Sequence, residues 1–474
     1  MTIPQLHPFQ LKIESQIANE YNRGFSKQLI QSPTGSGKTF MAASLIRDFY
    51  YNSEKTVVFT VGRVELVDQM SKTLDLFGVP HATIKSGKPW NFSERVQIAS
   101  IETLINNFWS WNKFEVVMVD ECHHLPAPSW DKLFLQYEDS HFFGFTATPL
   151  RLDGKSLEPY FETMIMGPSV KELIDDGFLA NCNIEVIDLD LNFDKCRVGK
   201  ISREYNLVDL RQAFAQFPDT PTKVVEYYHK RFNGDSPKTI AFCHDIESSK
   251  ALVNEFILQG FNAAHIDGMT NKTIREDTIK EFRNGTIDII SNVELFGEGF
   301  DVPDVDVTIL LRPTRSLTLS LQQIGRGMRK SSKDLTILDF VGNTCRLGSP
   351  LENRDWSFDS ELHLIHGATV YLNKTLNIVT RQLRRVKNCD SSLFKGEMDK
   401  DKMETTYKQL INFIKYKQVK ICANPDEVTH VHNYSATCNQ CGWNYKGRKP
   451  AQDAIVADET IDEFYTALTE FQLL

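Results

Sequence analysis

The sequence predicts an α/β fold of two tandem parallel-sheet lobes followed by a small C-terminal module. Between Lys27 and Phe161, short β-rich runs alternate with helical stretches. The same alternation restarts near Lys238 and fades beyond Cys345. Such alternation is typical of parallel sheets with crossover helices. We therefore place the first lobe at residues 1–167, the second at 168–345 and the accessory module at 346–474.

The first lobe is predicted from short apolar runs that are separated by stretches of helical periodicity. A strand ending near Gln31 precedes the others. The further strands are expected over Lys55–Val61, Val96–Ala99, Phe114–Val119 and Phe142–Thr146, with helices over Phe40–Tyr51 and Val64–Phe77.

The second lobe is predicted in the same way, after a boundary near Gly167. Residues Ser169–Phe217 are expected to form a strand-and-loop approach to its sheet. In the accessory module, Met403–Lys420 has the pattern of an amphipathic helix. The second-lobe strands are expected over Lys238–Phe242, Ala263–Ile266, Ile287–Ser291, Val307–Leu311 and Thr336–Phe340.

The composition is that of an ordinary globular protein, with 41% hydrophobic and 24% charged residues among 474. A net charge of −9 argues against a protein that coats nucleic acid through bulk positive charge. Nine scattered cysteines favour a reducing compartment. Because no apolar run reaches the length of a membrane span, we expect a cytoplasmic protein with no membrane partner.

A glycine-rich turn after the first strand predicts a phosphate site. Residues Ser32 to Thr39 read Ser-Pro-Thr-Gly-Ser-Gly-Lys-Thr. The glycines let successive backbone N–H groups face phosphate oxygens, the lysine reaches the terminal phosphates, and the last hydroxyl binds Mg²⁺. Ser32 stands where the strict pattern has its first glycine. The expected nucleotide-binding residues are Thr34, Gly35, Ser36, Gly37, Lys38 and Thr39.

Asp120 and Glu121 follow the apolar strand Val116–Val119. A carboxylate at a strand end beside the phosphate turn can hold magnesium, while its neighbour activates the attacking water. We assign these roles to Asp120 and Glu121 respectively. His123 is expected to couple this pair to the strand that carries Thr146 and Thr148.

Arg326 and Arg329 are three residues apart, which on a helix puts both on one face. From there they could reach the γ-phosphate across a cleft, as arginine fingers do. A solvated charged face is the alternative. The motif Gln322-x-x-Gly325-Arg326-x-x-Arg329 favours the catalytic role, and Gln322 is included in it.

With these motifs in this order, residues 4–358 resemble superfamily 2 helicases of the DExH type, in the group around XPB and UvsW. The resemblance implies two RecA-like lobes that use ATP and Mg²⁺. It also implies that Gln10 reads adenine, and that Gly299 and Asp301 belong to a motif touching both ATP and the strand. The DNA-remodelling members imply DNA as partner and unwinding or branch migration of forked or branched DNA as activity.

The same resemblance implies a set of strand-contacting residues in both lobes. Small hydroxyl groups at strand ends suit contacts to phosphates that do not read bases. Taken singly, each is an ordinary loop or cap residue. The set is Thr60, Arg63, Ser100, Thr103, His244 and Ser291.

The accessory module contains Cys438-Asn-Gln-Cys441, a spacing that suits two thiolates on one zinc ion. Cys422 with either His430 or His432 would complete four ligands. A pair of reduced, inert cysteines is the alternative.

Two other functions stay open on the residues alone. An RNA helicase would share the ATP chemistry, since backbone contacts hardly distinguish the two polymers. An ATP-gated DNA-binding component of a defence or restriction assembly would have the same two lobes as a helicase but would not move along DNA.

Overall fold

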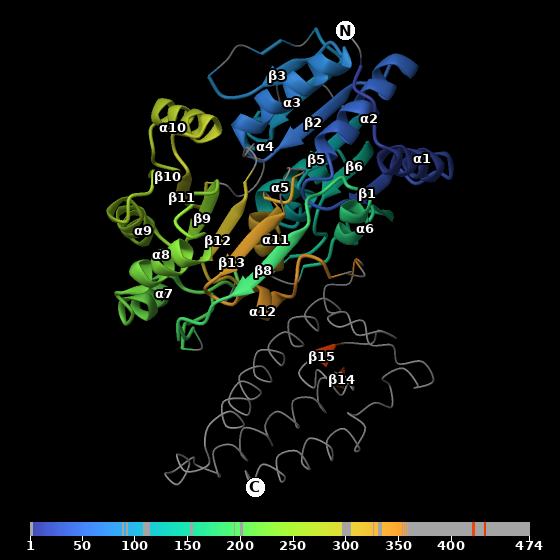
Figure 1. Ribbon diagram of the computed structural model, residues 1–474. Coiled ribbons are helices and arrows are strands. Elements are labelled where there is room, and N and C mark those ends of the chain that lie inside the picture. The colour runs from blue at the N-terminus through green and yellow to red at the C-terminus, as the bar shows by residue number, and fades with distance from the viewer. Residues whose placement is uncertain are drawn as a thin grey trace, which may run out of the picture. The chain divides into compact units, whose positions relative to one another are not determined.

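The computed structural model describes most of residues 3–358, together with two short strands near the C-terminus. The described ranges are 3–87, 90–91, 93–107, 114–151, 155–193, 195–199, 202–295, 305–325, 327–329, 334–352, 354, 356, 358, 420–421 and 431–432. The chain divides into two compact units, residues 1–343 with 353–360, and residues 344–352 with 361–474. The first unit contains two parallel sheets (Figure 1).

The first sheet has seven strands in the order β3-β4-β2-β5-β6-β1-β7, and all its pairs are parallel. Its inner strands are buried along nearly their whole length, as expected where helices cover both faces. The strands are β1 (Lys27–Gln31), β2 (Val57–Val61), β3 (Ala82–Ile84), β4 (Val96–Ser100), β5 (Val116–Asp120), β6 (His141–Thr146) and β7 (Thr163–Met166).

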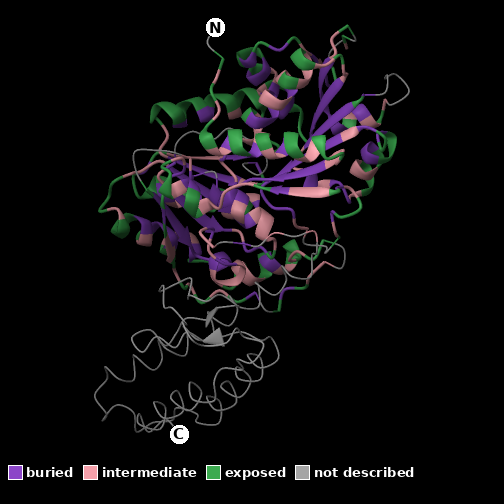
Figure 2. Cartoon of the chain, turned by 90° about the vertical axis from the view of Figure 1, so that its right-hand side faces the viewer, coloured by how far each residue is buried: buried purple, intermediate pink, exposed green. Residues whose placement is uncertain are grey.

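Alternate residues of each strand face two separate hydrophobic cores, because side chains alternate along a strand. Phe59 and Met118 pack on one side, against helices α1 (Pro8–Asn22), α2 (Lys38–Asn52) and α3 (Val64–Phe77). Val58 and Val117 pack on the other, against α4 (Ile101–Ile105) and α5 (Pro128–Gln136). In Figure 2 the strands are almost entirely buried while the helices expose one face. Phe358 also packs on the second core.

The second sheet has six strands in the order β10-β11-β9-β12-β13-β8, again all parallel. The strands are β8 (Cys182–Val186), β9 (Thr239–Cys243), β10 (Ala263–Asp267), β11 (Ile289–Val293), β12 (Val307–Leu311) and β13 (Leu335–Asp339). The helices are α6 (Val170–Asp175), α7 (Leu207–Ala215), α8 (Thr220–Arg231), α9 (Ile246–Leu258), α10 (Lys272–Asn284) and α11 (Leu317–Gly325).

The predicted fold class is confirmed: the chain has two parallel-sheet α/β lobes. Each strand predicted over Lys55–Phe340 is present, displaced by at most two residues at either end. The segment Ser169–Phe217 contains more helix than expected, because α6 and α7 both lie within it. The two sheets fall inside the predicted lobes, and the lobe boundaries themselves stay a prediction.

The second unit includes most of α12 (Asn343–Leu347) and an antiparallel pair, β14 (Lys420–Ile421) with β15 (Val431–His432). The helix predicted over Met403–Lys420 lies outside the described residues, apart from Lys420 in β14. Within the described part of the chain, no helix combines the length and the apolar character needed to cross a bilayer.

Candidate active site

The glycine-rich turn joins β1 to α2, as the motif predicts. β1 ends at Gln31 and α2 begins at Lys38. Gly35 and Gly37 have φ of 87° and 81°, the left-handed region that glycine adopts without strain. Ser32 is not among the described non-glycine residues with positive φ, and its Oγ lies 2.7 Å from Ser36 Oγ. The serine therefore closes the turn where the strict pattern has a glycine.

Gln10 braces this turn from α1. Its Nε2 donates to Ser36 O at 2.9 Å, and its Oε1 accepts from His7 N at 2.9 Å. A Cβ at Gly37 would lie 2.6 Å from Gln10 Nε2, so a side chain there would displace the Gln10 amide from its present position. Both ends of the Gln10 amide thus bond within the lobe. The contact between Gln10 and adenine stays a prediction.

Lys38 and Thr39 occupy the first turn of α2, where the N-terminal backbone groups favour an anion. Lys38 Nζ lies 3.2 Å from Ser32 O and 3.3 Å from Pro33 O, which holds the ammonium group over the turn. A triphosphate fits this arrangement, in which two glycines with positive φ, the N-terminus of α2 and the Lys38 ammonium group lie around one turn.

Asp120 ends β5, and Glu121 follows in the left-handed region with a φ of 50°. Such a conformation costs free energy in a non-glycine residue, and it is common at functional sites. Asp120 Oδ1 accepts the Glu121 backbone N–H at 3.1 Å. Because β6 alone separates β5 from β1, this acidic pair and the phosphate turn lie at the same carboxyl edge of the sheet.

Cys122 follows the acidic pair and is fully buried. Burial, together with the charges of Glu121 and Asp120, raises the pKa of its thiol well above the usual range. The thiol therefore stays protonated beside the two carboxylates, and it does not add a third negative charge to the site.

A run of close polar contacts leads from the acidic pair to the second lobe. His123 Nδ1 lies 3.3 Å from Glu121 Oε2 and 2.9 Å from Thr146 Oγ1. Thr146 Oγ1 in turn accepts from Thr148 N at 3.1 Å, and Thr148 Oγ1 lies 3.1 Å from Thr318 Oγ1 at the start of α11. The contacts expected of His123 are present, and their role in coupling stays a prediction.

Helix α11 ends against the phosphate turn. A Cβ at Gly325, the last residue of the helix, would lie 2.6 Å from Thr34 Cβ. Gln322 of the same helix is 3% exposed, and its Nε2 has no hydrogen-bond partner within the described residues. A buried amide with an unused donor fits a site that receives a polar ligand.

The helix expected to carry both arginines ends at Gly325, so the helical placement predicted for Arg329 is wrong, while its catalytic role stays a prediction. Gly327 N bonds back to Ile324 O in a turn, and Arg329 forms an isolated antiparallel bridge with Leu179. A Cβ at Gly327 would lie 2.5 Å from Leu335 Cδ1, so the chain just after the helix packs closely against Leu335. Arg326, Gly299 and Asp301 lie outside the described residues.

The predicted strand-contacting residues are placed differently from one another. Thr60 and Ser291 are fully buried, with hydroxyl groups that bond inside their lobes to Met118 O and to Ser249 and Cys243. Neither hydroxyl reaches the surface, and the strand contacts expected of these two residues stay a prediction.

The other members lie nearer to the surface or at element ends. Arg63 is exposed at the start of α3, and Ser100 Oγ caps α4 by accepting from Thr103 N at 3.3 Å. His244 is buried and stacks on Phe214, with ring centroids 4.0 Å apart. Sequence reasoning missed Phe214, because α7, which carries it, lies in the segment predicted as a strand-and-loop approach to the second sheet.

The predicted zinc ligands cannot be placed. Cys422, Cys438, Cys441 and His430 lie outside the described residues, and only the backbone of His432 is described, in β15. No cluster of three or more metal-binding side chains occurs among the residues that the structure covers.

Two family models match the chain in the order of its lobes. The model "Type III restriction enzyme, res subunit" matches residues 3–151, and "Helicase conserved C-terminal domain" matches residues 221–331. A 51.5 kDa protein of a Lactococcus phage (isolate 7-9) is 34% identical over 331 residues, which cover 69% of this chain and 68% of that protein. The chain therefore belongs to the superfamily 2 helicases.

A second relative of this helicase is a Saccharomyces cerevisiae protein named as an ATP-dependent helicase, IRC3. It is 27% identical over 72% of this chain, which spans only 52% of the yeast protein. The structure of the ATP-dependent Type ISP restriction-modification enzyme LlaBIII bound to DNA has the same fold, with 16% identity and a TM-score of 0.57, over 79% of this chain and 30% of that one. The chain is thus an enzyme of the ATPase/helicase class, a family that uses ATP and Mg²⁺.

Proposed function

We propose that this helicase is an ATP-dependent DNA motor that unwinds or remodels forked or branched DNA, including branch migration, in replication, recombination or repair. The observation that carries the proposal is the close approach of Gly325, at the end of α11, to Thr34 in the phosphate turn. A second contact, Thr148 to Thr318, joins the same two lobes. When two lobes meet at one nucleotide, binding and hydrolysis can move one lobe against the other.

The proposed roles follow from where the residues lie. Lys38 and the turn glycines bind the phosphates, and Thr39 and Asp120 hold the magnesium ion. Glu121 orients and deprotonates the attacking water. ATP with its metal supplies the phosphoryl-transfer chemistry when bound. From the second lobe, Gln322, Arg326 and Arg329 complete the closed state around the γ-phosphate.

DNA is preferred to RNA by analogy. The motif from Gln322 to Arg329 has the form found in DNA-remodelling members of the XPB and UvsW group, and the first-lobe model is named for a restriction enzyme. We therefore place the chain near that group. The polymer that activates hydrolysis decides the question: stimulation by single-stranded RNA and not by DNA would reverse the choice.

The experiment that tests the proposal is a screen of ATP hydrolysis with single-stranded, forked and four-way DNA and with RNA. We expect DNA to stimulate the wild-type enzyme, and we expect Lys38→Ala to lower the stimulated rate by about a hundredfold or more. Lys171→Ala is the matched control, because Lys171 is exposed on α6 and, within the described residues, its ion pair is with Asp175 one turn along the same helix. Hydrolysis that persists in purified Lys38→Ala would remove the assignment of this site.

A second candidate function is an ATP-gated DNA-binding component of a restriction or defence assembly. The match of residues 3–151 to a restriction-enzyme subunit favours it. Strand displacement on forked and four-way DNA separates the two functions. A motor releases the displaced strand in an ATP-dependent way, whereas a binding component hydrolyses ATP and leaves the duplex intact.

A zinc site in the accessory module belongs to the same proposal, as a support for duplex or junction binding. Metal content of the purified chain tests it. One zinc per chain, lost on Cys438→Ser, is the expected result, and a metal-free preparation that binds forked DNA normally would remove it.

A further inference from the structure

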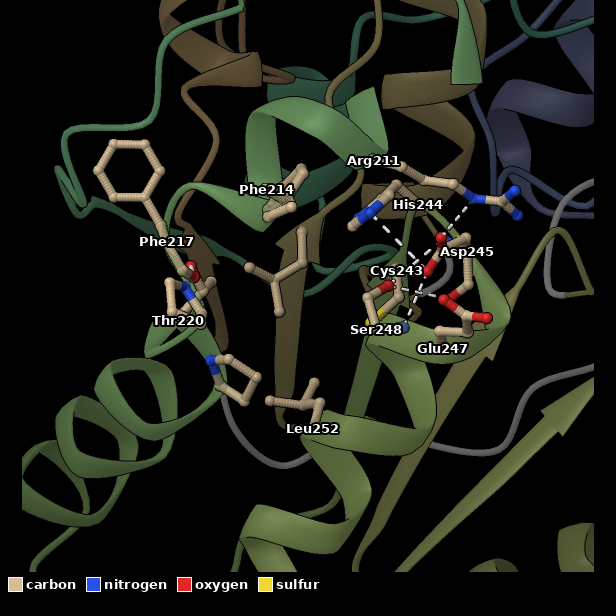
Figure 3. Close-up of a pocket in the computed structure, with 14 residues that line it drawn as sticks. Arg211, Phe214, Phe217, Thr220, Cys243, His244, Asp245, Glu247, Ser248 and Leu252 are labelled. Carbon is tan, nitrogen blue, oxygen red and sulfur yellow. Dashed lines mark hydrogen bonds and ion pairs between the residues drawn. The ribbon is translucent and has the colours of Figure 1, made fainter. Parts of the chain in front are cut away.

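The second lobe contains a pocket of about 240 Å³ beside His244, at the carboxyl ends of β9 and β12. Figure 3 shows its walls: Phe214 and His244 lie together at one end, Leu252 lies at the other, and Phe217 and Thr220 line one side. Its volume is below the roughly 300 Å³ at which pockets for drug-sized ligands begin. The pocket therefore suits a single small group.

The walls suit a flat and largely apolar occupant. Phe214 stacks on His244 with an interplanar angle of 12°, which gives this end of the pocket parallel aromatic faces. Phe217, Leu252 and Leu311 supply further apolar surface. Aromatic side chains of this kind are the platforms on which nucleic-acid bases stack.

One ring nitrogen of His244, which lines the pocket, lacks a hydrogen-bond partner among the described residues. His244 is 5% exposed, and its Nδ1 has no hydrogen-bond partner within the described residues. Leaving a buried polar atom unpaired costs free energy, so such an atom usually has a use. A ring that carries donors and acceptors on its edge would satisfy it.

The charges that line the pocket select against an anion inside it. Asp245 and Glu247 both line the pocket, and the Nε of Arg211, which also lines it, lies 2.7 Å from Asp245 Oδ2. The Arg211 side chain remains 56% exposed, so the rest of its guanidinium group faces outward. A neutral ring can enter the pocket while a phosphate attached to it stays at the rim near Arg211.

We propose that this pocket receives one nucleobase of the bound strand. The inference rests on the proposed function, which supplies a strand on this lobe, and it adds that the strand is held by a base as well as by its backbone. A protein side chain of similar size is the competing occupant, and the experiment distinguishes the two.

The test uses the full chain and single-stranded oligonucleotides of one length, either with bases or abasic throughout. Ala215 is exposed at the end of α7 and lines the pocket, so Ala215→Trp fills the pocket without entering the core. Gln212→Trp is the matched control, because Gln212 is exposed on the same helix and does not line the pocket. Phe217→Ala is a second variant, on another wall.

We expect the wild type and Gln212→Trp to bind the base-bearing strand about tenfold more tightly than the abasic strand. Ala215→Trp and Phe217→Ala should lose most of this preference and keep their affinity for the abasic strand. In the wild type, a strand carrying 5-iodouracil should cross-link to peptides that contain Phe214, Phe217 or His244.

Two outcomes overturn this inference and leave the proposed function standing. Ala215→Trp could keep the full preference for bases while DNA still stimulates hydrolysis, or the cross-links could map only to other parts of the chain. Either result would leave the pocket to a protein partner. If no strand binds the wild type, or none stimulates hydrolysis, the proposed function fails, and the inference fails with it.

Discussion

At the scale of single residues, the chemistry depends on how neighbours hold a few side chains in place. His123 is the clearest case, because one ring nitrogen lies within reach of both Glu121 Oε2 and Thr146 Oγ1. We therefore treat His123 as a positioning residue, since it acts on water activation through Glu121.

His123→Ala should separate nucleotide binding from stimulated hydrolysis. We expect the affinity for ATP to stay near the wild-type value and the DNA-stimulated rate to fall by about tenfold to a hundredfold, because Glu121 loses its contact with His123. Steady-state hydrolysis and nucleotide titration measure the two effects. His81→Ala is the control, since His81 lies in the same lobe and, within the described residues, its ring nitrogens bond to Ser71 Oγ and Val79 O. Equal losses in both variants would contradict this role.

The environment of His141 predicts that the protein loses stability in mild acid. Burial, and then the charge of Lys55 at 2.6 Å from its Nε2, lower the pKa of His141 from 6.5. His141 therefore binds a proton at a higher pH in the unfolded chain than in the folded one. Its contribution to the free energy of unfolding is complete above pH 6.5 and is lost as the pH falls below that value. Thermal unfolding should occur at a lower temperature at about pH 5.5 than at about pH 7.5, and less so in His141→Gln. An unchanged difference in His141→Gln would be evidence against this explanation.

The residue types of the phosphate turn and of Asp120-Glu121 could be predicted from sequence because their chemistry depends on local order along the chain. The burial of Thr60 and Ser291 could not, because it depends on the neighbouring strands and on the helices that cover both faces of each sheet, and these contacts are tertiary. The pairing of Arg211 with Asp245 joins residues 34 positions apart, and no local pattern indicates it.

At the scale of elements, the contact between α11 and the phosphate turn is the feature that most needs testing. Gly325 is the last residue of this helix and Gly327 follows two residues later. A Cβ at either position would collide with a neighbouring side chain, and the two neighbours belong to different lobes. At Gly325 the neighbour is Thr34 of the first lobe, and at Gly327 it is Leu335 within the second sheet.

Gly325→Ala should lower DNA-stimulated hydrolysis by about a hundredfold with little change in thermal stability, because it holds α11 away from the phosphate turn. Gly327→Ala should instead lower the unfolding temperature, because the clash lies inside one lobe. Hydrolysis assays and thermal unfolding of both variants make the comparison. If Gly325→Ala hydrolyses ATP normally, the observed contact is not used in the reaction.

Strands with continuous apolar runs, such as Val116–Asp120, could be predicted because both faces of a parallel sheet are covered. The edge strands β7 and β8 are partly exposed, with mixed burial that leaves a weak signal. The end of α11 at Gly325 was also missed, since the three-residue spacing of the arginines suggested a longer helix. Packing of Gly327 on Leu335 ends the helix, and that contact is tertiary.

At the scale of the whole molecule, the proposed function requires that the two sheets of one chain share one ATP. The first lobe supplies the phosphate turn and the acidic pair, and the second supplies the end of α11 and the arginines of its motif. If this is correct, a change confined to the second lobe should stop hydrolysis without preventing nucleotide binding to the first.

Arg326→Ala provides the most direct measurement of that claim. We expect its affinity for ATP to stay within about threefold of wild type, and its DNA-stimulated hydrolysis to fall by about 10³-fold or more, because a positioned arginine stabilises the transition state. Hydrolysis at the wild-type rate in Arg326→Ala, with DNA bound and ATP saturating, would show that the first lobe works alone and would contradict the account.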